Sequence, residues 1–158
     1  MNTILIPIEQ TVNKLYQGDC LEIMPDMPDK SIDMILCDLP YGTTACKWDT
    51  IIPLDTLWKE YKRIIKDNGA IVLCGSEPFS SYLRMSNIDW YKYDWVWVKN
   101  RIKTYTDKGG LVLDNCAGSG TTGVACINTN RNYILIEKDP EYCGIIEKRC
   151  SQQVFDLR

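Results

Sequence analysis

The segment that most constrains the fold is LVLDNCAGSGTTG, residues 111–123, in which a short apolar run leads through an acidic residue into a glycine-rich turn. Its glycines have the spacing G-x-G-x-x-G, which between a strand and a helix is typical of a nucleotide-binding turn in a parallel sheet. We expect a helix over residues 118–129 and the next strand within NYILIEKD, residues 132–139. This succession predicts an α/β domain with a mostly parallel sheet.

The same alternation of short apolar runs and helical stretches continues through the rest of the chain. Pro53 begins a stretch with apolar residues at helical spacing, and Gly69 is a typical stop for that helix. Asp139 and Pro140 are a typical N-cap and first residue of a last helix, which we expect to end near residue 150. The remaining expected elements are strands within 13–19, 31–38, 70–76 and 91–99, a helical turn through Leu21, Ile23 and Met24, and a helix over 77–85.

Length and composition indicate one globular domain over residues 1–158, with 45% hydrophobic and 25% charged residues. No apolar run reaches about 18 residues, so we expect no membrane span. The N-terminal MNTILIPIEQ lacks the basic start of a signal peptide. Eight cysteines without a C-x-x-C pair favour buried thiols in a reducing cytosol over a disulfide framework.

Two features of the composition exclude classes of function. The chain contains no histidine, which excludes histidine general bases and removes most zinc sites, so we expect no metal site. The formal net charge is −3, which is the wrong sign for a chain that binds nucleic-acid phosphates by itself.

Two cofactors fit the glycine loop, a nicotinamide dinucleotide and S-adenosyl-L-methionine. Glu137, nineteen positions after Gly118, suits the ribose of either, because a carboxylate accepts hydrogen bonds from both hydroxyls. Asp114 separates them, since a carboxylate here repels a pyrophosphate but attracts the ammonium and sulfonium of S-adenosyl-L-methionine. The loop therefore favours the methyl donor, while a solvated acid at a strand end remains the alternative for Asp114.

A second motif, Asp-Leu-Pro-Tyr at residues 38–41, follows a buried strand, so we expect it at the same sheet edge as the glycine loop. A carboxylate from Asp38 and a backbone carbonyl from Leu39 can each accept an N–H of an exocyclic base amine, which aligns the nitrogen with a methyl donor. Pro40 fixes the backbone, and Tyr41 offers a face on which a base that has left the duplex can stack. The alternative is an ordinary strand-to-loop turn.

Together with GDCLEIMPDMPDKSIDMILC before it and VLDNCAGSGTTGVAC and YILIEKD after it, this tetrad resembles that of a DNA amino-methyltransferase. The tetrad precedes the glycine loop, an order similar to the circularly permuted β group of phages and restriction–modification systems. The resemblance extends from about Leu15 to Arg149. It implies a Rossmann-like, three-layer methyltransferase fold with about seven strands and a reversed hairpin. It also implies duplex DNA with a flipped base as substrate, S-adenosyl-L-methionine as cofactor, and a cytoplasmic location in a bacterial or phage-infected cell; a homodimer is compatible with it.

The resemblance also assigns site residues. Asp38 to Tyr41 would hold the target base, with aspartate in the first position favouring the N6 amine of adenine over N4 of cytosine. The usual tetrad is Asp-Pro-Pro-Tyr, so Leu39 departs from the family pattern. The departure should be tolerated, because the expected role of this residue belongs to its backbone carbonyl and not to its side chain. The residues expected around the cofactor are Asp19, Asp114, Asn115, Ala117, Gly118, Ser119, Gly120, Thr121, Thr122, Glu137 and Lys138.

One part of the family pattern is missing. Relatives carry a target-recognition segment of many tens of residues and a Lys-Pro pair where WVWVKNR here continues directly into IKTYTDKGG. We therefore expect a seam, or a missing recognition segment, near residues 100–103. The predicted function is methyl transfer to N6 of adenine in DNA. The alternatives are transfer to N4 of cytosine and a catalytically idle cofactor-binding core.

Overall fold

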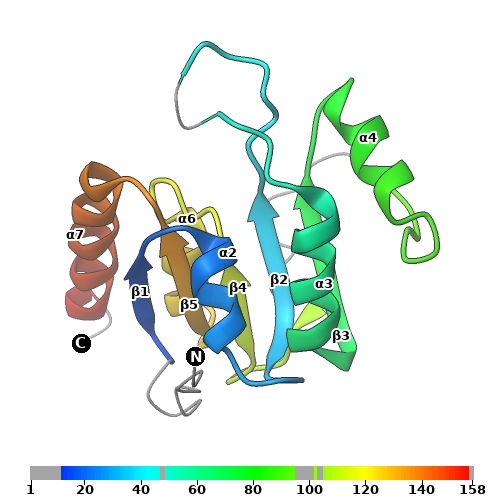
Figure 1. Cartoon of the computed structure of the whole chain (residues 1–158). Coiled ribbons are helices and arrows are strands. Elements are labelled where there is room, and N and C mark those ends of the chain that lie inside the picture. The colour runs from blue at the N-terminus through cyan, green and yellow to red at the C-terminus, as the bar shows by residue number, and fades with distance from the viewer. Residues whose placement is uncertain (1–11, 47–48, 95–101, 103–104, 157–158) are drawn as a thin grey trace.

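The structure, a computed structural model, describes residues 12–46, 49–94, 102 and 105–156, with side chains described as far as residue 151 (Figure 1). At its centre is a sheet of five strands in the order β1-β5-β4-β2-β3, in which every neighbouring pair is parallel. The strands are β1 (Lys14–Gln17), β2 (Ile32–Asp38), β3 (Ile65–Cys74), β4 (Leu111–Asp114) and β5 (Asn132–Glu137).

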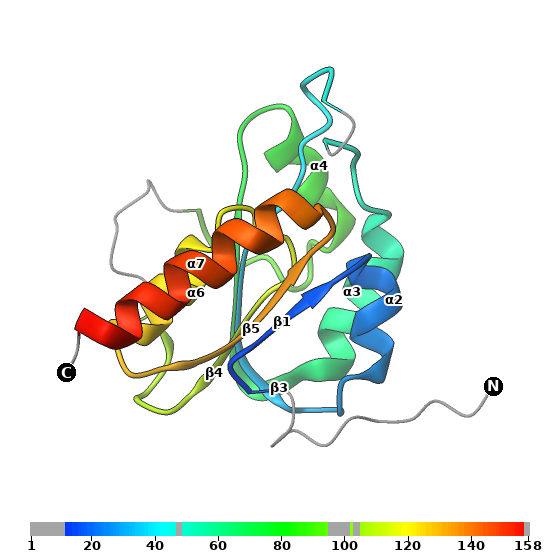
Figure 2. The same ribbon diagram turned by 90° about the vertical axis from the view of Figure 1, so that its left-hand side faces the viewer.

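Helices cover both faces of this sheet. The helices are α2 (Cys20–Ile23), α3 (Leu54–Ile64), α4 (Phe79–Ser86), α6 (Thr121–Ile127) and α7 (Pro140–Asp156), with a short 3-10 helix, η1 (Met24–Asp26). In the view of Figure 2, α2 and α3 lie on one side of the sheet and α6 and α7 on the other. The predicted three-layer α/β arrangement is thereby confirmed. None of the helices in the described part of the chain has both the length and the apolar character needed to cross a bilayer.

The described residues form five strands, whereas about seven were expected, two of them in a reversed hairpin. Residues 91–94 are irregular and exposed, and the rest of the strand expected within 91–99 lies outside the described residues. The seam expected near 100–103 also lies outside them, apart from Ile102, which is buried beside Met34 and Val112.

Helix α3 has the predicted buried apolar stripe, but it ends at Ile64 and not at Gly69. The carbonyls of Arg63 and Ile64 accept hydrogen bonds from the backbone N–H groups of Lys30 and Ser31, at 3.0 and 2.9 Å. A distant segment thus satisfies the end of the helix, and no glycine turn is needed there. Gly69 instead lies inside β3, where an added Cβ would be 3.0 Å from a backbone carbonyl oxygen of β2.

Helix α7 starts as predicted, with Pro140 as its first residue. The Asp139 carboxylate accepts a hydrogen bond from the N–H of Glu141 at 2.8 Å, which satisfies one of the free donors of the first turn. The helix continues beyond the predicted end near residue 150 to Asp156. Helix α6, in contrast, is shorter than predicted and begins only at Thr121, because the glycines before it have left-handed backbone angles.

The central strands β2, β4 and β5 are buried on both faces, as expected for a parallel sheet between two helical layers. Their fully buried side chains are Ile32, Met34, Ile35, Cys37, Val112, Leu113, Ile134, Leu135 and Ile136. Because these strands are packed on both sides, the residues that follow each of them start from fixed positions.

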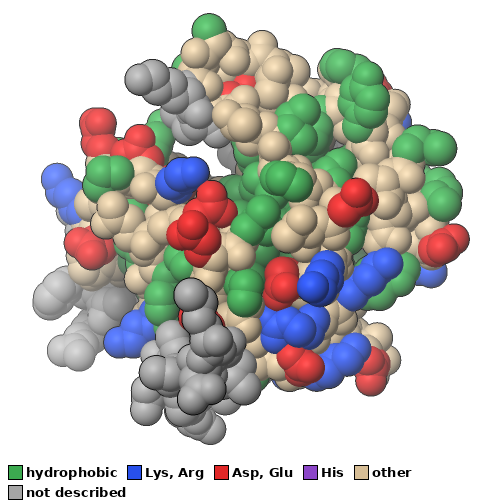
Figure 3. Space-filling view, in the orientation of Figure 1, with side chains coloured by type: hydrophobic (Ala, Val, Ile, Leu, Met, Phe, Trp, Pro, Cys, Tyr) green, Lys and Arg blue, Asp and Glu red, His purple; other side chains and the backbone are tan. Residues whose placement is uncertain are grey.

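Lysine and arginine side chains gather over α3 and the start of β3 on the face shown in Figure 3, interspersed with acidic ones. Two ion pairs involve the start of β3: Lys66 Nζ lies 2.6 Å from Asp33 Oδ1, and Lys30 Nζ lies 2.7 Å from Asp67 Oδ1. This part of the surface is therefore mixed in charge, unlike the strongly basic stripe that usually binds DNA phosphates.

Candidate functional site

The carboxyl ends of the parallel strands share one edge of the sheet, and a predicted motif follows each of four of them. Strand β2 ends at Asp38, the first residue of the tetrad, and its neighbour β4 ends at Asp114. Strand β5 ends at Glu137, and β1 ends two residues before Asp19. The strand order therefore brings together motifs that lie far apart in the sequence.

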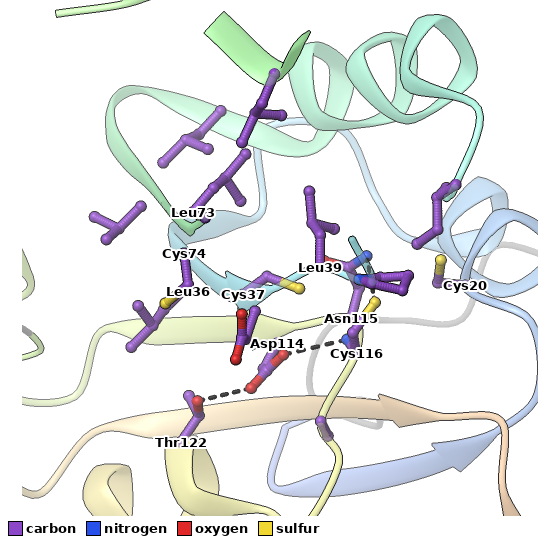
Figure 4. Close-up of a pocket in the computed structure, with 18 of the residues that line it drawn as sticks. Cys20, Leu36, Cys37, Leu39, Leu73, Cys74, Asp114, Asn115, Cys116 and Thr122 are labelled. Atoms are coloured by element: carbon purple, nitrogen blue, oxygen red, sulfur yellow. Dashed lines mark hydrogen bonds between the residues drawn. The ribbon is translucent and has the colours of Figure 1, made fainter. Parts of the chain in front are cut away.

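A broad, open depression extends along this edge, and Figure 4 shows part of it. All four tetrad residues line it, and so do all the residues expected around the cofactor except Gly120. An added Cβ at Gly120 would be 2.9 Å from Cγ1 of Ile146, so this glycine faces α7 and allows the loop to pack closely on that helix. The individual roles of the lining residues stay predictions.

The tetrad has an exposed carboxylate and a partly buried aromatic ring. The hydroxyl of Tyr41 donates a hydrogen bond to Oδ1 of Asp38 at 2.5 Å. The Tyr41 ring stacks on Phe79, with ring centroids 5.1 Å apart and an interplanar angle of 28°. Burial and the Asp38 carboxylate both raise the pKa of Tyr41, so its hydroxyl stays a donor at neutral pH. Leu39 is only 3% exposed, so its side chain packs in the core. This is compatible with the prediction that only its backbone carbonyl acts on the base.

Asp114 is a buried carboxylate beneath the glycine loop, with an exposed fraction of 5%. Its two oxygens accept hydrogen bonds from the N–H of Cys116 at 3.2 Å and the hydroxyl of Thr122 at 2.7 Å (Figure 4). Burial raises the pKa of Asp114 to about 6, which these hydrogen bonds only partly offset and the charge of Asp38 reinforces. Two carboxylates close to each other at neighbouring strand ends favour a cationic ligand between them.

Three contacts fix the glycine loop. Gly118 and Gly120 have φ angles of +50° and +77°, which glycine adopts without strain. The N–H of Gly118 donates to Oε2 of Glu137 at 2.7 Å. From α7, the Arg149 guanidinium donates to the carbonyl of Ser119 and, at 2.9 Å, to its hydroxyl. The loop therefore has a defined shape, held by β5 on one side and α7 on the other.

Glu137 and Asp19 both engage backbone N–H groups in this structure. Besides the Gly118 bond, Oε1 of Glu137 accepts the N–H groups of Lys138 and Asp139, both at 2.9 Å. Asp19 accepts the N–H of Leu21 at 2.9 Å, and its other oxygen lies 3.2 Å from Nζ of Lys138. A ribose on Glu137, as predicted, would have to share or replace some of these hydrogen bonds.

Asn115 and three cysteines, two of them buried and Cys116 half-buried, form the floor of the site (Figure 4). Asn115 is 2% exposed, and its Oδ1 accepts a hydrogen bond from the Tyr61 hydroxyl at 2.6 Å. The side chains of Cys20, Cys37 and Cys116 lie around it, and burial raises the pKa of the Cys37 thiol to about 11. All eight cysteines are free, as predicted, and this group behaves as small apolar residues under the loop.

Four residues that hold the site were not predicted from the sequence: Asp49, Tyr61, Phe79 and Arg149. Each of them contacts a motif that lies elsewhere in the chain or on the other side of a loop. A pattern of neighbouring residues cannot predict contacts of this kind. The strongest available signal was an aspartate shortly after the Gly-Thr-Thr that follows the tetrad, since carboxylates often bind the N–H groups of a turn.

Comparisons with known proteins agree with this geometry. The family described as DNA methylase matches residues 97–148. The chain is 32% identical to the Type II methyltransferase M.HinfI of Haemophilus influenzae, in an alignment of 250 residues that includes 90% of this chain and 69% of that protein. That alignment is longer than this chain, so it contains positions for which this chain has no residue.

Two solved structures share the fold. A DNA modification methylase of Thermus thermophilus, TTHA0409, solved in complex with S-adenosyl-L-methionine, is 16% identical with a TM-score of 0.68, over 89% of this chain and 95% of that one. The PvuII DNA methyltransferase, described as cytosine-N4-specific, is 13% identical with a TM-score of 0.66, over 86% and 85% of the two chains.

The predicted Rossmann-like methyltransferase fold is confirmed by these structures. The identity to M.HinfI, at the coverage given above, decides the family. The chain belongs to the family of DNA methyltransferases that act on the N6 amine of adenine or the N4 amine of cytosine.

Proposed function

We propose that this chain transfers a methyl group from S-adenosyl-L-methionine to the N6 amine of adenine in DNA. The observation that carries the proposal is the parallel pairing of β2 with β4, in the register Met34–Val112 and Ile35–Leu113. This pairing places the tetrad and the glycine loop side by side at one sheet edge. A base amine held by the first motif would therefore lie next to a cofactor held by the second.

The residues present fit the proposed cofactor. When bound, S-adenosyl-L-methionine supplies an electrophilic methyl group on a positively charged sulfur. Asp114 and Asp38 supply the negative charge that favours such a cation, and Asp114 is buried enough for the attraction to be weakly screened. Glu137 ends β5 beside the glycine loop, and a ribose bound to its carboxylate would have to share or replace the hydrogen bond that it accepts from the N–H of Gly118. A dinucleotide would instead bring a pyrophosphate beside these carboxylates.

The tetrad supplies the chemistry for the base. The amine nitrogen of adenine is a weak nucleophile, because its lone pair is delocalised into the ring. A hydrogen bond from the amine to Asp38 would orient the nitrogen toward the methyl group. The carboxylate would accept a proton as the N–C bond forms and the carbon–sulfur bond breaks, with the neutral thioether as the leaving group. Proton acceptance of this kind contributes roughly 10²–10⁴-fold to a rate. The Tyr41 hydroxyl, which is bonded to Asp38 in this structure, would give way to the amine.

Adenine is proposed as the target because the tetrad begins with aspartate, as in the sequence-based prediction. The family includes enzymes for both amines, and a similar structure is that of a cytosine-N4-specific methyltransferase, so transfer to cytosine is the second candidate. The target base would leave the duplex to reach the depression, at an unstacking cost of a few kcal/mol. The length of the M.HinfI alignment supports the view that the DNA-recognition part of relatives has no full counterpart here.

Product identification tests this proposal. The protein is incubated with duplex DNA of mixed sequence and with S-adenosyl-L-methionine carrying a deuterated methyl group, and the DNA is digested to nucleosides for mass spectrometry. Deuterated N6-methyladenine is expected, and the Asp38→Asn variant should form it roughly 10²–10⁴-fold more slowly. Deuterated N4-methylcytosine would establish the second candidate. Cofactor binding by calorimetry without any labelled nucleoside would identify a catalytically idle core.

A further inference from the structure

The loop after the tetrad contains one buried carboxylate. Among the described residues 42–46 and 49–51, Asp49 alone is buried, with an exposed fraction of 7%. An aspartate on an exposed loop normally faces water, because its charge is strongly hydrated. Its burial therefore indicates a specific set of partners.

Those partners are the three backbone N–H groups that directly follow the tetrad. Oδ1 of Asp49 accepts the N–H of Gly42 at 2.8 Å, and Oδ2 accepts those of Thr43 at 2.9 Å and Thr44 at 2.6 Å. Gly42 has a φ angle of +68°, and this left-handed turn lets consecutive N–H groups converge on one anion. An added Cβ at Gly42 would be 2.8 Å from Cγ1 of Ile51, so the loop also returns onto this glycine.

This arrangement, which we call the Asp49 clamp, begins at Gly42, one residue after Tyr41. On its other side, the tetrad is fixed where Asp38 ends β2. The Tyr41 ring rests on Phe79, but neither ring contact nor strand fixes the backbone beyond Tyr41. The clamp therefore constrains the direction in which the chain leaves the tetrad, while Asp38 and Phe79 hold the Tyr41 ring itself.

We propose that Asp49 is a positioning residue for the target base, which holds the tetrad in the geometry that methyl transfer requires. The inference rests on the proposed function, and it adds a residue that does not touch the base, the cofactor or the reacting atoms. Transfer depends on alignment of the amine with the methyl group, and a displacement of about 1 Å can cost roughly 10²-fold in rate.

A carboxylate suits this role better than a neutral side chain. Burial of Asp49 opposes its ionisation, but the hydrogen bonds from Gly42, Thr44 and Thr43 outweigh it and lower its pKa to about 2. The clamp is therefore charged at every pH at which the protein would be assayed. Because Gly42, Thr43 and Thr44 are themselves exposed, water can replace the carboxylate in a variant. Loss of the clamp should then loosen the loop without unfolding the domain.

The test compares wild type with Asp49→Asn, which keeps the shape but loses the charge and one acceptor, and with Asp49→Glu, which keeps the charge. The matched control is Asp107→Asn, an exposed aspartate at the opposite end of β4. We expect kcat of Asp49→Asn to fall roughly 10²-fold, with the domain still folded and with cofactor affinity and the shape of the pH profile as in wild type. Asp49→Glu should recover part of this loss, and Asp107→Asn should behave as wild type.

An unchanged kcat in Asp49→Asn would overturn the inference, and so would a shifted pH profile, which would make Asp49 a group that exchanges protons in the reaction. A joint loss of kcat, cofactor affinity and thermal midpoint in both Asp49 variants would show a purely structural role. Hydrogen–deuterium exchange separates this inference from the proposed function, because it needs no activity. Faster exchange confined to the amides of residues 42–44 is expected in Asp49→Asn even if wild type transfers no methyl group, and unchanged exchange there would refute the clamp.

Discussion

The buried carboxylate of Asp114 gives the most quantitative prediction, through the variant Asp114→Asn. Its pKa is raised from 3.8 to about 6, mainly by burial, so folding favours the protonated acid. The stability that this group contributes is therefore complete below pH 3.8 and is lost as the pH rises through about 6. At one pKa unit per 1.36 kcal/mol, the ionised form lowers the free energy of unfolding by about 3 kcal/mol at neutral pH or above.

Asparagine removes this pH dependence while keeping nearly the same shape. Urea unfolding of the cofactor-free protein at several pH values measures the difference in stability between the variant and wild type. That difference should move in favour of the variant by about 1.5 kcal/mol between about pH 5 and pH 8, because roughly half of the loss in wild type falls in this interval. The hydrogen bond that asparagine fails to make, to either Thr122 or Cys116, is a constant offset and cancels in this comparison.

Cofactor affinity should change in the opposite direction. In wild type, calorimetry should find that S-adenosyl-L-methionine binds more tightly as the pH rises through about 6, because the ionised Asp114 attracts its positive charges. The variant should bind more weakly at neutral pH and without this pH dependence. A stability difference that does not vary with pH, or wild-type affinity in the variant, would refute the reasoning. Asp107→Asn, on the surface, is the control for both measurements.

Three further predictions concern other parts of the site. Asp38→Asn should reduce methyl transfer at saturating cofactor by roughly 10²–10⁴-fold while calorimetry finds cofactor binding retained; undiminished transfer would remove Asp38 from the mechanism. Tyr61→Phe leaves Oδ1 of the buried Asn115 without its 2.6 Å partner, so urea unfolding should show a loss of about 1–3 kcal/mol, and an unchanged midpoint would contradict this. Gly120→Ala places a Cβ 2.9 Å from Ile146 on a backbone with a φ of +77°. The free energy of unfolding should fall by at least about 1–2 kcal/mol, the cost of a left-handed alanine, and a thermal scan should show a lower midpoint. A wild-type melting curve would contradict this and would show that α7 moves away easily.

The parts of the fold that depend on local pattern could be predicted from the sequence. The apolar runs that become β2, β4 and β5 are bounded by polar residues, and Asp139-Pro140 marks the start of α7. The end of α3 could not be predicted, because its last carbonyls are satisfied by the N–H groups of Lys30 and Ser31, which lie on another segment. Gly69 is a typical helix stop by residue type, but it lies inside β3, where an added Cβ would be 2.7 Å from the Ile65 side chain and 3.0 Å from the carbonyl oxygen of Asp33.

In the site, too, the features that depend on local sequence could be predicted and the contacts between distant segments could not. The tetrad and the glycine loop are contiguous in sequence, so their chemistry and their shared sheet edge could be derived from residue types and strand order. The contacts of Asp49 and Tyr61 join residues from different segments, and these appear only when the chain is folded. Glu137 shows a further limit, because its predicted availability for a ribose depends on hydrogen bonds to N–H groups that the sequence does not reveal.

The central claim is that one sheet edge holds the methyl donor and the target base together, and a crystal structure with bound S-adenosyl-L-methionine tests it most directly. The methionine part of the cofactor is expected beside Asp114 and the glycine loop, and its ribose near Glu137. The transferable methyl group should face Asp38 and Tyr41 across the gap between β4 and β2. A cofactor bound at another part of the surface, or one whose methyl group points away from the tetrad, would contradict it.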